Sequence, residues 1–385
     1  IILAFTIQLK SQSVMMFVER ISGQLSVSID RILKTTVHNN IPFPKPDSFM
    51  IVGTHDGTFH CDESLACSLL RLHPKFDNAI VVRSRNPDIL KCCDIVVDVG
   101  AQYDPSSYRF DHHQREFADV MEDCASFTKL SSAGLVYKHF GKEILASILT
   151  NYSQQLAADS NVIDIIYKKI YKDFIEHIDA IDNGISVCDT PPKYCISTTL
   201  SNRVGALNPC WNEPQTPELL NIRFKEAMCM TGGEFLQTAH YLISSWWPAR
   251  AIVQLAVENR FNIHSSGRII LLDQYCPWKD HLFEIEKEMG AEPVLYVLCG
   301  DSSWQFRINA VPETPHSFVS RKALPETWRG VRDEALSELV GVPGAVFVHA
   351  SGFIGGHQTM DGALSMAVQS LQLGEESRIL GKCIP

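Results

Sequence analysis

Three consecutive side chains that can bind a metal ion stand out in this sequence. They are Asp111, His112 and His113, within the run 109–114. Imidazole combined with carboxylate suits Mn²⁺ or a similar first-row ion, whereas Ca²⁺ and Mg²⁺ prefer oxygen ligands alone. Because three such residues in a row are uncommon in a globular sequence, we interpret them as part of a metal site.

Two further groups of acidic and imidazole side chains lie upstream, each after a short apolar run. The first contains His55, His60 and Asp62, and the second contains Asp98, directly after Ile95–Val97. Either group alone is explained as well by polar surface residues or a capped turn. A parallel sheet, however, would bury the Asp98 strand on both faces, where an unpaired carboxylate is costly. We therefore interpret the three groups as one cation site.

Strand and helix patterns alternate around these groups. Apolar runs at 49–53, 78–82 and 94–99 predict strands, and the helical spacing of apolar residues in 62–72 predicts a helix. This alternation indicates βαβ units and a mostly parallel sheet, whose ligand site lies at the carboxyl ends of the strands. We expect all three groups to meet at that edge.

A later helical pattern, 161–182, ends in two carboxylates, Asp179 and Asp182, before the break at Asn183 and Gly184. With one of them, the donors suffice for two divalent ions bridged by one carboxylate. The predicted metal ligands are His55, His60, Asp62, Asp98, His112 and Asp182. Two ions ~3.5–4 Å apart would hold an in-line displacement at phosphorus, so the pattern predicts a phosphoesterase.

The composition fits a folded protein of two domains, with 385 residues, 45% hydrophobic and 20% charged. The net charge of −10 argues against a broad basic surface for duplex DNA. Twelve cysteines without a zinc-type spacing are interpreted as reduced thiols. The apolar runs are shorter than the ~20 residues that span a bilayer, so we expect no membrane partner.

We expect the α/β fold class, with two α/β domains and a cleft between them. Residues 1–47 form a leader, either a transit peptide or an unstructured extension. Residues 48–205 form the metal-binding catalytic domain, with a mostly parallel sheet. A helical connection, 206–250, leads to a smaller α/β substrate domain, 251–385.

A glycine-rich stretch in the second half contains Gly355, Gly356 and His357. We expect a strand-to-helix turn there, where glycine lets backbone amides approach a phosphate closely. A simple tight turn is the plainer interpretation of these residues alone. Arg329 and Arg332, just before, are either phosphate contacts or solvated surface charges.

Three motifs, at 53–63, 109–114 and 349–356, also carry a resemblance to a known family. Asp111 to His113, with Asp98 upstream, resembles the signature of the DHH phosphoesterase superfamily. Together the motifs closely resemble the MYG (melanocyte proliferating gene) family of DHH-like 3′–5′ RNA exonucleases. The similarity extends over about residues 48–375.

The resemblance implies a metal-dependent 3′–5′ exonuclease that acts on single-stranded RNA or short oligonucleotides and releases nucleoside monophosphates. It implies two Mn²⁺ ions, with Mg²⁺ as the alternative, and a location in the mitochondrion, the nucleus or both, with the cytoplasm also open. Two other functions remain for the same site: hydrolysis of a small phosphoanhydride or cyclic dinucleotide, and a non-catalytic regulatory role that retains the metal. The oligomeric state is left open.

Carried over by position, the resemblance makes His60 and Asp62 the counterparts of two aspartates in the superfamily's D-x-D motif, and Asp98 the bridging ligand. Histidine in place of the first aspartate is a departure from the pattern. It leaves open the metal preference and whether His55 is a ligand.

The resemblance also assigns roles around the triplet, where Asp111 orients, His112 binds metal and His113 faces the substrate. With Asp98, these are the predicted catalytic residues. It favours Asp182 over Asp179 as the later ligand. A Gly-Gly-His element of the superfamily's substrate domain faces the metal site, which makes the glycine-rich stretch and its two arginines the substrate-binding candidates: Gly355, Gly356, His357, Arg329 and Arg332.

Overall fold

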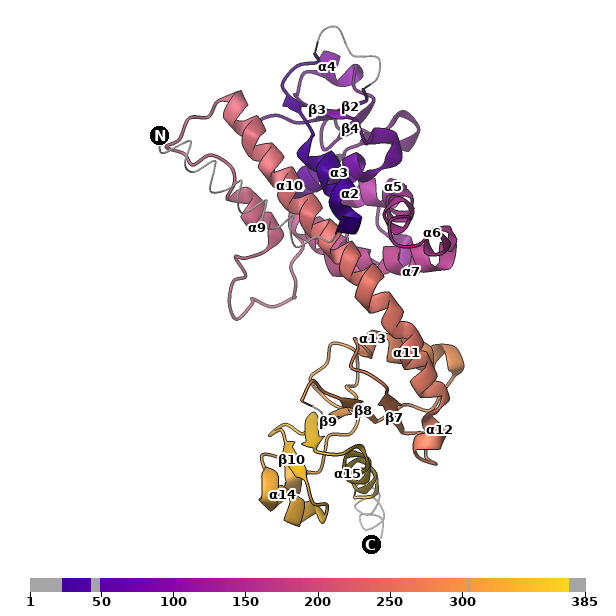
Figure 1. Ribbon diagram of the computed structural model, residues 1–385. Coiled ribbons are helices and arrows are strands. Elements are labelled where there is room, and N and C mark those ends of the chain that lie inside the picture. Colours follow the sequence, from indigo (N-terminus) through magenta and orange to yellow (C-terminus); the bar gives the residue numbers. More distant parts are fainter. Residues whose placement is uncertain (1–22, 43–48, 304, 374–385) are drawn as a thin grey trace. The chain divides into compact units, whose positions relative to one another are not determined.

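The protein divides into two compact units, with the boundary between Ser244 and Ser245. Its structure is a computed structural model that describes residues 23–42, 49–303 and 305–373 (Figure 1). Each unit combines helices with one β-sheet, so the predicted α/β class is confirmed. Among the described residues, no helix is both long and apolar enough to cross a membrane.

The sheet of the first unit has the strand order β1-β3-β2-β4-β6-β5. All neighbouring strands are parallel except β5, which runs antiparallel to β6. The strands are β1 (Val37–His38), β2 (Ile51–Thr54), β3 (Ile80–Arg83), β4 (Ile95–Val97), β5 (Tyr103–Asp104) and β6 (Arg109–Phe110). The three apolar runs predicted as strands thus became β2, β3 and β4.

The central helix of the first unit is α3 (Cys61–Leu72), in which every residue is buried. It packs against α2, α5, α8 and α10, and Figure 1 shows it between α10 and α5. The other helices are α2 (Ser26–Leu33), α4 (Pro87–Lys91), α5 (Ser132–Leu149), α6 (Gln154–Ala158), α7 (Ser160–Ile170), α8 (Glu176–Asp182), α9 (Leu200–Gly205) and α10 (Pro217–Tyr241). The predicted helix 161–182 is α7 and α8, joined by the π-helical turn η5 (Tyr171–Ile175).

The first unit begins earlier in the chain than we expected. We placed residues 1–47 in a leader, but α2 and β1 are part of the fold. Ile29 and Ile32 of α2 are buried, and β1 extends the parallel sheet beside β3. The apolar side chains of α2 pack on α10 and α3, which a composition rich in Ser and Thr did not reveal. The predicted transit peptide falls largely on residues 1–22 and 43–47, which lie outside the described residues.

The sheet of the second unit has the order β10-β11-β9-β8-β7, with β7 and β8 parallel and the other pairs antiparallel. One apolar core lies on the side of α11 and α13, and another on the side of α14 and α15. The strands are β7 (Ile269–Leu272), β8 (Tyr296–Gly300), β9 (Phe306–Ala310), β10 (Ala345–Val348) and β11 (Ile354–His357). The helices are α11 (Trp247–Glu258), α12 (Arg260–Ile263), α13 (Lys279–Met289), α14 (Asp333–Val340) and α15 (Met360–Gln372).

The glycine-rich stretch forms a strand instead of the turn that we expected. It is β11, an interior strand between β10 and β9, so its amides pair with neighbouring strands. A Cβ at Gly355 would lie 2.9 Å from Cδ1 of Leu324, and one at Gly356 would lie 2.7 Å from a guanidinium nitrogen of Arg307. Close packing against Leu324 and Arg307 therefore explains both glycines.

Gly232 of α10 tests the packing of α2 in the first unit. A Cβ there would lie 2.5 Å from Cδ1 of Ile32 and 2.9 Å from Cβ of Ser68. We expect Gly232→Ala to lower the free energy of unfolding by about 1–3 kcal/mol, because overpacking forces neighbours apart. Denaturant unfolding measures this. The control is Gly205→Ala, where a Cβ meets open space, and equal stability of the two variants would contradict the packing.

Candidate metal centre

The three groups predicted to form one site do meet at one edge of the first sheet. The parallel strands β2, β4 and β6 end at Thr54, Val97 and Phe110. The next residues in the chain are His55, Asp98 and Asp111. The predicted position at the carboxyl edge is therefore confirmed, and it follows from the parallel order of these strands.

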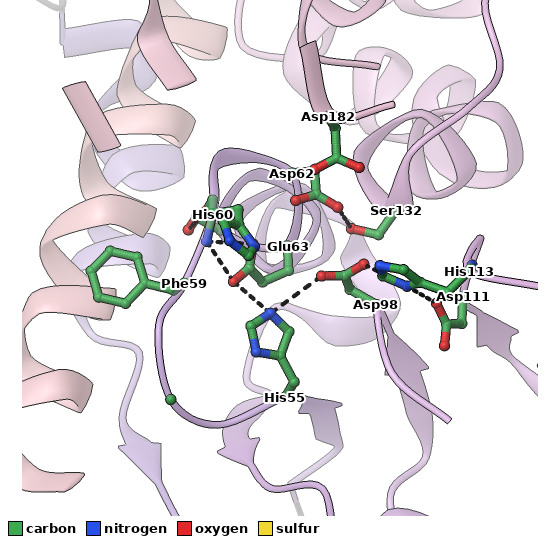
Figure 2. Close-up of polar contacts among 12 residues, drawn as sticks. His55, Phe59, His60, Asp62, Glu63, Asp98, Asp111, His113, Ser132 and Asp182 are labelled. Carbon is green, nitrogen blue, oxygen red and sulfur yellow. Dashed lines mark hydrogen bonds and ion pairs between the residues drawn. The ribbon is translucent and has the colours of Figure 1, made fainter. Parts of the chain in front are cut away.

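His55 lies buried between two carboxylates (Figure 2). Its Nε2 atom is 3.0 Å from Oε1 of Glu63 and 3.3 Å from Oδ2 of Asp98. Its Nδ1 donates to the Asp56 carbonyl oxygen at 3.0 Å. Burial would lower the pKa of His55, but hydrogen bonds to Asp98 and Glu63 outweigh it and raise the pKa to about 10. The ring therefore counts as a cation between two acids in the absence of metal.

Glu63 is a site residue that we did not predict. Its two carboxylate oxygens share the hydrogen of the His60 backbone N–H, at 2.8 and 3.0 Å, at the start of α3. Burial raises its pKa. A glutamate at the third helical position is typical of a capping box. This pattern is the feature of the sequence from which a role for Glu63 could have been predicted. The same carboxylate also contacts His55. Glu63 therefore both caps α3 and belongs to the site.

Asp98 occupies the centre of the site. Its backbone is left-handed, with φ of 58°, a conformation that aspartate tolerates better than most residues. Its Oδ1 atom is 3.4 Å from Nδ1 of His112 and 3.7 Å from Nδ1 of His113. Burial, reinforced by the Asp62 carboxylate, raises the pKa of Asp98 well above its usual range. A negative charge at this position therefore needs a compensating cation.

A third group joins Asp62 and Asp182 through His112. Nε2 of His112 is 2.9 Å from Oδ2 of Asp182, and Oδ2 of Asp62 accepts from Oγ of Ser132 at 2.8 Å. Burial and the neighbouring Asp62 raise the pKa of Asp182. Burial opposes ionisation of Asp62 too, but His112 and the Ser132 hydrogen bond hold its pKa below the usual value.

The side chains fit a divalent metal centre. Three buried polar atoms here, Oδ1 of Asp62, Oδ1 of Asp98 and Nδ1 of His112, have no hydrogen-bond partner within the described part of the chain. Buried polar atoms are rarely left unpaired in native proteins, and carboxylate oxygen with imidazole nitrogen is a usual first-row donor set. A cation would pair all three.

The possible ligand atoms form three overlapping groups, in each of which they lie within 4.8 Å of one another. Asp98 belongs to two groups and His112 to two, which is the pattern that bridged or adjacent ions need. The groups are His55, His60, Glu63 and Asp98; Asp98, Asp111, His112 and His113; and Asp62, His112 and Asp182. All the predicted metal ligands appear among them.

Asp111 orients two parts of the site through hydrogen bonds. Its Oδ2 accepts from the backbone N–H of Ala101 at 2.6 Å, which fixes the loop after Asp98. Its Oδ1 accepts from Nδ1 of His113 at 2.7 Å, and this hydrogen bond raises the pKa of His113. The contacts agree with the orienting role that the resemblance implies for Asp111.

The Asp179 side chain is hydrogen-bonded to the start of α5 and not to the other predicted ligands. Its buried Oδ1 accepts from the Ser131 backbone N–H and hydroxyl, at 3.0 and 2.6 Å, and from the Gly134 N–H at 3.1 Å. It thereby caps the start of α5, while Asp182, one turn later on α8, reaches His112. This geometry supports Asp182 in the choice that the sequence left open.

The segment after α8 returns to the metal-binding loop through Asn208. Its side-chain oxygen accepts from the backbone N–H of Phe59 at 3.1 Å, and its amide donates to the Phe59 carbonyl at 2.9 Å. Phe59 is fully buried and directly precedes His60. Asn208 therefore fixes the backbone that carries His60.

A pocket of about 490 Å³ opens beside these groups and is lined by five predicted site residues, His60, Asp98, His112, His113 and Asp182. The rest of its lining carries no predicted ligand and consists of Cys61, Lys129, Ile178, Ile181, Asn183, Ser201 and Gly205. Another cavity, of about 540 Å³, lies between α2 and β3 and is lined by none of the predicted site residues.

The predicted substrate-binding residues lie in the second unit. His357 is buried; its Nδ1 accepts from the Thr359 N–H at 3.0 Å and its Nε2 donates to the Pro343 carbonyl at 3.1 Å. Both ring nitrogens are thus used within the unit. Arg329 donates from Nε to the Leu324 carbonyl at 3.0 Å, whereas the Arg332 side chain is 66% exposed.

A sequence model of the MYG1_exonuc family, described as uncharacterised protein family UPF0160, matches residues 51–371. The chain is 50% identical over 327 residues to mouse "MYG1 exonuclease", covering 83% of this chain and 84% of the relative. It is 49% identical over 329 residues to the human "MYG1 exonuclease" (83% and 85%). It is 46% identical over 339 residues to "MYG1 protein C27H6.8" of Caenorhabditis elegans (86% and 97%). No solved structure matches.

Metal binding should stabilise the protein through these groups. We expect Mn²⁺ at a hundred times its Kd to raise the free energy of unfolding by about 2.7 kcal/mol, since only the folded chain assembles the ligands. Asp98→Ala and His112→Ala should abolish the gain in a thermal unfolding assay with and without Mn²⁺. Asp88→Ala, on an exposed carboxylate of α4, is the control. Full Mn²⁺ stabilisation of Asp98→Ala would contradict the site.

Asn208 should affect metal affinity although it offers no ligand. Groups that orient a ligand change metal affinity by about 10–100-fold. We therefore expect Asn208→Ala to weaken Mn²⁺ binding by that amount in calorimetry, because the Phe59 and His60 backbone loses both anchoring hydrogen bonds. Asn161→Ala, on an exposed position of α7, should bind Mn²⁺ normally. Unchanged affinity in Asn208→Ala would show that the loop holds its position unaided.

Proposed function

The chain belongs to the MYG1_exonuc family, UPF0160, and we propose that it is a metal-dependent phosphodiesterase of the DHH type. In this proposal it removes nucleoside monophosphates from the 3′ end of single-stranded RNA or short oligonucleotides. The single observation that carries the proposal is the set of overlapping ligand groups around Asp98 and His112 beside an open pocket. The mammalian relatives named MYG1 exonuclease support a nucleic-acid substrate.

The residues of the three ligand groups have different roles in the proposed reaction. Divalent ions, two Mn²⁺ in our proposal, would polarise the scissile phosphate and lower the pKa of the attacking water. Asp98 is placed to contribute to two of the groups, and His112 joins the second group to the third. Asp62 and Asp182 supply the remaining negative charge, and Ser132 fixes the Asp62 carboxylate.

His113 is placed to act on the substrate. Its side chain is 62% exposed and lines the pocket. Asp111 accepts the hydrogen on Nδ1, which leaves Nε2 to face the substrate. The raised pKa of His113 favours the protonated ring. Such a ring binds a phosphate oxygen and can give its Nε2 proton to the leaving 3′ oxygen.

The charge balance favours a short or unpaired substrate. A net charge of −10 repels polyanions at long range, so binding has to be local, at the cations of one pocket. We also propose a mitochondrial or nuclear location. Its support is the family resemblance.

The test is the hydrolysis of 5′-labelled single-stranded RNA with Mn²⁺. We expect shortening from the 3′ end in single-nucleotide steps, no activity after chelation, and no activity in Asp98→Ala or His112→Ala. His113→Ala should retain Mn²⁺ binding but lose about 10²–10⁴-fold in rate, the usual contribution of a general acid. His177→Ala, on an exposed position of the helix that carries Asp182, should be fully active.

Parallel assays with pyrophosphate and a cyclic dinucleotide test the alternative that the protein hydrolyses a small phosphoanhydride or a cyclic dinucleotide. Faster hydrolysis of either than of RNA would replace the exonuclease proposal with a small phosphoesterase. Mn²⁺ binding without hydrolysis of any of the three substrates would indicate a regulatory protein. RNA cleavage that survives both Asp98→Ala and His112→Ala would overturn the mechanism.

A further inference from the structure

Part of the lining of the metal-centre pocket consists of side chains that have no role in the proposed reaction. The metal-binding groups form the acidic wall. The other wall includes Lys129, from the turn before α5, with Ile178 and Ile181 of α8 and Ser201 and Gly205 of α9. A cation and apolar side chains thus line the same pocket as the carboxylates.

Lys129 has one contact through its backbone and one through its side chain. Its carbonyl accepts from the side-chain amide of Asn183 at 2.9 Å, directly after the predicted ligand Asp182. Its ammonium lies 5.4 Å from the centre of the Phe117 ring, which in turn makes an edge contact with the His112 ring at 6.3 Å. The ammonium is therefore linked through one aromatic ring to the metal-binding groups.

The Lys129 ammonium differs from its neighbours in having no carboxylate partner among the described residues. Lys138 pairs with Asp119 at 2.9 Å and Lys142 with Asp164 at 2.8 Å. In a chain with ten more acidic than basic residues, a lysine without an acidic partner beside an acidic pocket is available for an anionic ligand.

The apolar part of the wall suits a base or a ribose. Ile178 and Ile181 both line the pocket, and Ile178 is buried while Ile181 is 43% exposed. The pocket volume of about 490 Å³ lies in the usual range for sites that hold one small ligand. This volume is enough for a single nucleotide.

We propose that this wall is the subsite for the terminal nucleotide, in which the Lys129 ammonium pairs with its phosphate and the isoleucines contact its base or ribose. The inference rests on the proposed function, because it names how the same pocket receives an unpaired 3′ end. Lys129 is then a binding residue that supplies the positive charge the overall composition lacks.

The experiment compares Lys129→Ala, Lys129→Arg and wild type in the full chain with Mn²⁺, using AMP and adenosine as calorimetric probes. We expect Lys129→Ala to weaken AMP binding by about 10–100-fold, the loss of one charge-assisted hydrogen bond. Adenosine, which has no phosphate, should bind both proteins equally, and Lys129→Arg should restore most of the AMP affinity. The KM for RNA should rise in parallel, with a smaller change in kcat and unchanged Mn²⁺ affinity.

Lys91→Ala is the matched control, since it removes one positive charge from a side chain that is 75% exposed on α4. Equal AMP affinities of Lys129→Ala and Lys91→Ala, or no AMP binding by wild type, would overturn the subsite. RNA hydrolysis with no Lys129 effect would reject the subsite and keep the exonuclease. Lys129-dependent AMP binding without RNA hydrolysis would keep the subsite and reject the exonuclease.

Discussion

The first unit depends on burying several carboxylates beside one another. Asp62, Glu63 and Asp98 are each at most 4% exposed, and their like charges meet where the parallel strands end. Without compensation, burial of a carboxylate costs several kcal/mol. Part of the compensation comes from His55, whose pKa is raised by hydrogen bonds to Asp98 and Glu63, and part from hydrogen bonds at the start of α3. Oδ1 of Asp62 and Oδ1 of Asp98 still lack a hydrogen-bond partner among the described residues, and a bound metal ion would complete the compensation.

The surrounding structure holds these charges in place through backbone hydrogen bonds. Glu63 caps α3, Asp179 caps α5, and Asp111 fixes the loop after Asp98. Each acid therefore satisfies amides that would otherwise be unpaired, while it sets the position of a neighbouring ligand. Asn208, which is uncharged and lies 149 residues from Phe59 in the sequence, also satisfies a backbone amide and positions the backbone before His60. Residues whose like charges repel one another are thus held near each other by hydrogen bonds within the protein.

Much of this site could be predicted from the sequence, because the residues that follow parallel strands are read directly from the chain. His55, Asp98 and Asp111 each come one position after a strand, and the strands are marked by their apolar runs. Glu63 and Asn208 could not be ranked in the same way, since their roles depend on partners that only the fold brings together. The α2 helix was missed for a related reason, as its apolar face has meaning only against α10.

The glycine-rich strand and the metal-binding groups differ in how far their polar atoms are already paired within the protein. Gly355, Gly356 and His357 have the residue types of a phosphate loop, yet the amides of β11 are paired within the sheet and both nitrogens of His357 have partners. His112 has the same side chain as His357, but its Nδ1 is buried without a hydrogen-bond partner among the described residues. Residue type therefore indicates which groups could bind a ligand. A cluster of several such groups, with buried atoms that lack hydrogen-bond partners, indicates more strongly where a ligand binds, and Asp62, Asp98 and His112 form such a cluster at the carboxyl edge of the first sheet.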